Sequence, residues 1–94
     1  MEIVVNVGEQ FPQLTGPASD EFAKELLRLE DSDFEVVVLN MSGVESISSM
    51  AMGSIFASHQ KLNEQGRRLI IKDASAQVSR LLKMVNMAHL SEEE

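Results

Sequence analysis

The sequence predicts a single α/β domain with a mixed β-sheet of about four strands and about three helices packed on it. Short runs of β-branched and aliphatic residues alternate along the chain with segments whose apolar residues recur at helical spacing. A chain of 94 residues suffices for one hydrophobic core, so residues 1–94 are expected to form one domain. Strands separated by helices imply right-handed β-α-β crossovers, which place helices against the sheet.

The first fourteen residues predict an edge hairpin. Residues 2–6 are rich in β-branched side chains, and residues 10–14 alternate in character, which is typical of two strands. Gly8 and Glu9 lie between them as a turn.

An amphipathic helix is predicted to follow the break at Gly16 and Pro17. Ser19 offers a hydroxyl N-cap, and the apolar residues behind it recur at helical spacing up to about Glu30. These apolar residues are Phe22, Leu26 and Leu29.

The middle of the chain predicts a buried central strand and a second helix. Residues 34–39 form an apolar run interrupted only by Glu35, as expected for a strand covered by helices. After a turn at residues 42–43, Ser48 or Ser49 opens a helix that Gly66 ends. Its predicted core face consists of Met52, Ile55, Phe56 and Leu62.

A glycine inside this helix, Gly53, suggests close packing against the sheet. Glycine costs roughly 1 kcal/mol relative to alanine within a helix unless it has a steric purpose. We therefore expect Gly53→Leu to overpack the helix and lower the melting temperature.

The last part of the chain predicts one more strand and one more helix. Residues 68–72 form the strand, and Ser75 caps a helix that Asn86 ends. The apolar stripe of this helix is Val78, Leu81, Leu82 and Val85. Residues 91–94 form a short acidic tail.

Composition argues against several classes of function. A net charge of −7 with scattered basic residues disfavours binding to nucleic acids or to an anionic membrane surface. The chain has no cysteine, and its first residues lack the pattern of a secretory signal, so a cytoplasmic location is expected.

No residue pattern in the sequence supports catalysis or a cofactor. His59 and His89 are isolated, without cysteine or acidic residues at metal-ligand spacing, so no metal site is expected. Phosphate-binding glycine loops and a serine-histidine-acid pattern are also missing, so we expect neither a cofactor nor enzymatic activity.

Residues 36–53, VVVLNMSGVESISSMAMG, resemble the central segment of STAS domains, best known from bacterial anti-sigma factor antagonists. The strand ending Leu-Asn-Met, the following Ser-Gly-Val, and Ile-Ser-Ser before a helix are similar to that family's pattern. Further similarity lies in Leu14-Thr15-Gly16, in Glu64-Gln65-Gly66 followed by Arg68-Leu69-Ile70-Ile71, and in Val78, Leu81 and Leu82.

The resemblance implies a phosphorylation site at Ser49. Many antagonists read Asp-Ser-Ser-Gly-Leu-Gly where residues 48–53 read Ser-Ser-Met-Ala-Met-Gly. Ser48 therefore stands in place of the acidic residue, whereas Ser49 retains the serine that family members phosphorylate. From the residues alone, either serine can simply cap the helix; the resemblance favours Ser48 as the cap. Met50 is either an outward contact for a partner or partly buried.

The resemblance also implies a function based on contacts between proteins. The chain would bind an anti-sigma factor with serine kinase activity, through Ser46, Ser48, Ser49, Met50 and Gly53, and release it when Ser49 is phosphorylated. A second possibility is a constitutive STAS subunit of a transporter ATPase complex, and a third is a self-associating, stressosome-like assembly. The sequence leaves the oligomeric state open.

Overall fold

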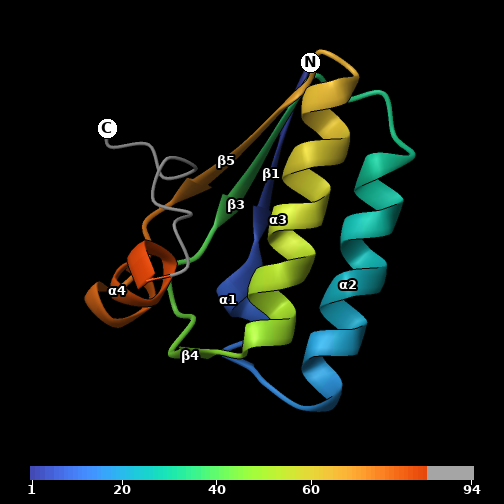
Figure 1. The fold of residues 1–94 in the computed structure, drawn as a ribbon. Helices are drawn as coiled ribbons and strands as arrows, with labels where there is room; N and C mark the ends of the chain where they lie inside the picture. The colour runs from blue at the N-terminus through green and yellow to red at the C-terminus, as the bar shows by residue number, and fades with distance from the viewer. Residues whose placement is uncertain (85–94) are drawn as a thin grey trace.

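The computed structural model describes residues 1–84 and forms an α/β domain (Figure 1). The elements in chain order are β1 (Glu2–Asn6), α1 (Val7–Gln10), β2 (Gln13–Leu14), α2 (Pro17–Glu30), β3 (Val36–Asn40), β4 (Ser46–Ile47), α3 (Ser49–Glu64), β5 (Arg68–Lys72) and α4 (Ala76–Met84). Strands β1, β3 and β5 form one sheet in the order β1-β3-β5, and β2 and β4 form a second.

The predicted α/β class is confirmed, but the predicted edge hairpin is wrong. Strand β1 pairs with β3 in parallel, with Val4 opposite Val38, and β2 pairs in parallel with β4. Residues 7–10, expected to form the turn and the start of the second strand, are a single helical turn that carries the chain away from β1. Among residues 1–84, all strand pairings are parallel.

The core lies between the sheet and the two long helices. Helices α2 and α3 run side by side across one face of the β1-β3-β5 sheet, and α4 lies near the end of β5 (Figure 1). Strand β3 is central, as predicted, and its Val37 and Leu39 are fully buried under these helices. Phe22 and Leu26 of α2 and Ile55 and Leu62 of α3 fill the space above them.

Two predictions about helical residues are wrong. Helix α2 begins at Pro17 after Gly16, whose φ of 56° lies in the left-handed region, so Ser19 is inside the helix and does not cap it. Phe56 was predicted on the core face of α3, but its side chain is 40% exposed, whereas Met52, Ile55 and Leu62 are buried. A helical stripe predicts a face only to within one position, and Phe56 lies beyond its edge.

The other predicted boundaries agree with the structure. Ser48 is the N-cap of α3, and Gly66, with φ of 75°, follows its C-cap Gln65. The Ser75 hydroxyl accepts a hydrogen bond of 3.2 Å from the Val78 amide at the start of α4. Four parts of the prediction lie outside the described residues, namely Val85, Asn86, His89 and the tail of residues 91–94.

Candidate functional site

A small two-stranded pairing outside the main sheet fixes the start of α3. Strand β4 pairs with β2, which places Ile47 opposite Leu14. The Ser48 amide then donates a hydrogen bond of 2.8 Å to the Leu14 carbonyl. The backbone therefore enters α3 from a fixed direction, with Ser48 in extended conformation and Ser49 as the first helical residue.

The Ser48 hydroxyl is committed to local hydrogen bonds. It accepts one from the Ala51 amide at 3.1 Å, and it lies 2.7 Å from the Ser19 hydroxyl of α2. Ser19 donates to the Leu14 carbonyl at 3.3 Å, so the remaining proton, that of Ser48, is donated to Ser19. Ser48 thus caps α3 and joins it to the start of α2, as predicted for the cap.

Ser49 has the opposite environment. Its side chain is exposed, and its hydroxyl has no hydrogen-bond partner among residues 1–84. It lies in the first turn of α3, where unpaired amides and the helix dipole favour a negative group. Its hydroxyl is therefore accessible to a modifying enzyme.

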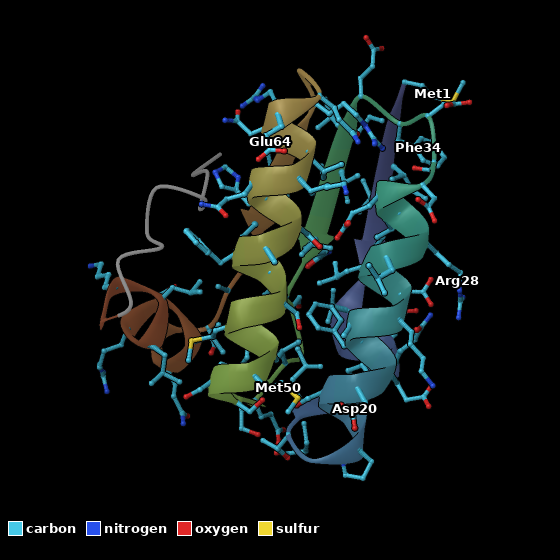
Figure 2. The ribbon with its side chains drawn as sticks, turned by 45° about the vertical axis from the view of Figure 1, so that its right-hand side comes forward. Met1, Asp20, Arg28, Phe34, Met50 and Glu64 are labelled. Carbon is cyan, nitrogen blue, oxygen red and sulfur yellow. The ribbon has the colours of Figure 1, made fainter. Side chains whose placement is uncertain are left out.

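Three of the five predicted contact residues share an exposed face of α3. Ser49, Met50 and Gly53 lie within one turn, and the Met50 side chain is 59% exposed, so it points outward (Figure 2). Ser46 and Ser48 are half-buried. The Ser46 hydroxyl binds the Gln13 side chain of the paired strand, and Ser48 faces α2.

The expected packing role of Gly53 is wrong. A Cβ atom built on Gly53 would meet no atom within 4 Å, and the residue is exposed. Gly53 therefore does not bring α3 closer to the sheet, and the predicted destabilisation by Gly53→Leu through overpacking has no structural basis.

Ser19 is the residue at this site that sequence reasoning misplaced. It is 1% exposed and forms the hydroxyl contact with Ser48, twenty-nine residues away in the chain. A serine near a helix start predicts a cap. Only the packing of α2 beside α3 turns Ser19 inward, and no local pattern signals that.

Within residues 1–84, no cluster of three or more histidine, aspartate or glutamate side chains could hold a metal ion, and no helix has the length and apolar character of a membrane span. The pKa of Glu35 is lowered by its hydrogen bond to the Met1 ammonium group and by that charge. This pair lies at the opposite end of the molecule from Met50 (Figure 2).

The chain belongs to the STAS domain family, whose model matches residues 12–92. Its fold is similar to that of the anti-sigma factor antagonist SpoIIAA in its unphosphorylated form, with a TM-score of 0.81, 15% identity, and coverage of 99% of this chain and 79% of that chain. The Bacillus cell fate determinant SpoIIAA in its phosphorylated form is also similar, with a TM-score of 0.70, 11% identity, and coverage of 99% and 82%. No curated protein sequence matches the chain.

Proposed function

We propose that this STAS domain is an anti-sigma factor antagonist that binds an anti-sigma factor with serine kinase activity and is switched by phosphorylation of Ser49. The observation that carries the proposal is the division of roles between two adjacent serines. Ser48 caps and anchors α3, so the neighbouring Ser49 is left exposed with an uncommitted hydroxyl. The similarity in fold to SpoIIAA, an antagonist known in both phosphorylation states, supports the same function.

The mechanism requires only a change of charge on an exposed face. Unmodified protein binds through the face formed by Ser49, Met50 and Gly53, together with Ser46 of β4 and the cap residue Ser48. A phosphate on Ser49 adds a charge of about −1.5 to −2, which repels an acidic partner surface. The fold itself does not need to change, because no described hydrogen bond depends on the Ser49 hydroxyl.

Variants of Ser49 test the proposal. Ser49→Ala should keep the melting temperature and the affinity for the partner but prevent phosphorylation. Ser49→Asp should also keep the melting temperature, since a carboxylate at a helix N-terminus is favoured by about 0.3–1 kcal/mol, yet it should weaken partner binding. Melting curves, partner dissociation constants and mass spectrometry of protein from its native cells provide the measurements. Equal affinities with no phosphoserine found would end the antagonist proposal.

The second candidate is a constitutive STAS subunit of a transporter ATPase complex. The sequence Ser48-Ser49-Met50-Ala51 departs from the Asp-Ser-Ser-Gly pattern of many antagonists, and the exposed Met50 provides an adaptable contact that needs no modification. In that case Met50→Ala should weaken binding to the partner while Ser49→Asp leaves it unchanged. Gene neighbourhood separates the two: a sigma factor and a kinase for the first candidate, a permease and an ATPase for the second.

A further inference from the structure

We propose that the groove between α2 and α3 receives a lysine or arginine side chain from a protein partner, with the aliphatic part of that side chain between the helices and its cation at Glu30. The proposal rests on the proposed function only in taking the partner to be a protein. Its first evidence is the groove itself, which has a volume of about 160 Å³ and is lined by residues of both helices.

The groove is lined mainly by apolar side chains, two of which are small. Ala23 of α2 and Ala57 of α3 contribute small side chains to its lining, and the buried Leu26 lines it as well. Leu27 stands at the rim with 58% of its side chain exposed. An apolar lining of this kind can accept the methylene groups of a long side chain.

A carboxylate lies in the same groove without a cation. Glu30 is half-buried, and its Oε2 accepts a hydrogen bond of 2.5 Å from the Ser58 hydroxyl. Within residues 1–84, no lysine or arginine nitrogen lies within 4.0 Å of this carboxylate. The Arg67 guanidinium binds the Glu30 carbonyl oxygen at 2.9 Å and not its side chain. Several lone pairs of the carboxylate therefore stay available to a further donor.

This combination selects a basic occupant over a purely apolar one. A leucine or methionine in the groove would cover Glu30 without pairing it, and burying an unpaired charge is costly. Lysine and arginine place methylene groups along apolar surface and carry the charge at the end. This matches a groove that offers apolar side chains together with the Glu30 carboxylate. The net charge of −7 also favours a basic partner segment.

The groove continues the exposed face at the start of α3. Met50, Gly53 and Ala57 recur at intervals of three and four residues, so they lie along one side of the helix. Met50 and Ala57 are about 10 Å apart along the axis, and Ser49 and Ser58 about 13 Å. One partner helix can therefore contact both regions. The distance of about 13 Å between Ser49 and Ser58 exceeds the Debye length of about 8 Å. A phosphate on Ser49 therefore acts mainly on the partner surface next to it and not on a cation at Glu30.

The proposal is tested by titrating the protein alone with n-butylguanidinium. Binding is monitored by NMR through the methyl signals of Ala23, Leu27 and Ala57. These methyl signals should shift together. Glu30→Gln keeps an acceptor for Ser58 and removes the charge, so it should raise the dissociation constant about fivefold, as expected for an ion pair of about 1 kcal/mol. Glu21→Gln, at an exposed site on the same helix, is the matched control and should leave it unchanged.

A second variant and a neutral probe complete the test. Ala57→Leu should fill the groove and abolish the shifts, with its fold checked by the melting curve. The neutral probe, 1-butanol, should bind more weakly than n-butylguanidinium. Its dissociation constant should be the same for the wild type and for Glu30→Gln. Absence of shifts at the three methyl groups, equal binding of 1-butanol, or equal weakening by Glu21→Gln would overturn the proposal. Because no partner is used, these results are independent of the Ser49 experiment.

Discussion

Ser48 and Ser49 are identical and adjacent, yet their surroundings assign them different roles. Ser48 precedes the first helical residue, so its hydroxyl oxygen can accept a hydrogen bond from the Ala51 amide in the first turn. Its proton is donated to the buried Ser19. Ser49 is one position further on, where the helix turns its side chain out to solvent. A hydroxyl held by two hydrogen bonds is poorly suited to modification, whereas an exposed one is well suited.

We predict that Ser48→Ala destabilises the protein by about 1–2 kcal/mol, because it removes the cap of α3 and leaves the buried Ser19 hydroxyl without its neighbour. Ser49→Ala should change the free energy of unfolding by less than about 0.5 kcal/mol. Urea unfolding followed by far-UV circular dichroism measures both. Equal losses for the two variants would contradict the division of roles.

At the scale of elements, Gly8 and Gly53 have the opposite of the roles expected from the sequence: Gly8 is closely packed and Gly53 is not. Gly8 looks like an ordinary turn residue, but α1 packs against the turn after β3. A Cβ atom on Gly8 would lie 1.8 Å from the Ser42 carbonyl oxygen, a distance that only backbone movement can relieve. Gly53, in contrast, lies near the start of α3, and a Cβ atom built on it would meet no atom within 4 Å.

We therefore predict opposite effects for two glycine-to-alanine substitutions. Gly53→Ala should stabilise the protein by about 0.5–1 kcal/mol, because alanine is the better helix former and nothing obstructs its methyl group. Gly8→Ala should destabilise it, by more than about 1 kcal/mol, since the backbone of residues 42–43 must shift. Thermal unfolding of both variants provides the comparison, and a stabilising Gly8→Ala would show that the contact with Ser42 is not tight.

For the molecule as a whole, Arg67 joins segments that are far apart in the chain. Its guanidinium donates to the carbonyl oxygens of Leu29 and Glu30 at the end of α2, at 3.1 and 2.9 Å. Its Nε donates to the Phe34 carbonyl at 2.7 Å, just before β3. Arg67 thus supplies further donors to the carbonyls at the end of α2, where the Leu29 carbonyl also accepts from Ser32, and it holds the α2–β3 connection against the start of β5.

We predict that Arg67→Ala lowers the free energy of unfolding by about 1.5–3 kcal/mol, the range for hydrogen bonds that involve a charged group. Arg28→Ala is the matched control. Its salt bridge to Glu25 is exposed and should contribute no more than about 0.5 kcal/mol. Urea unfolding of both variants gives the difference, and a loss for Arg67→Ala as small as that for Arg28→Ala would show that the carbonyls of α2 are solvated equally well by water.

The sequence by itself determined most of the elements, though not α1 or β4, and the likeness to STAS domains. Apolar spacing and end signals placed β3, β5 and α3 close to their observed positions, because these depend on residues within one or two turns of each other. They left the cap of α3 open between Ser48 and Ser49, and the resemblance favoured Ser48, which is the observed cap. The motif around residues 48–53 indicated Ser49 by resemblance, and the structure shows that this serine is exposed.

The tertiary structure alone decided which elements meet. Parallel pairing of β1 with β3 and of β2 with β4 replaced the expected hairpin, because strand partners are chosen by long-range packing and not by proximity in the chain. The same packing turned Ser19 toward Ser48, placed Gly8 against Ser42 and left Gly53 in the open. It also created the groove at Glu30, since residues on separate helices share a surface only after those helices have packed.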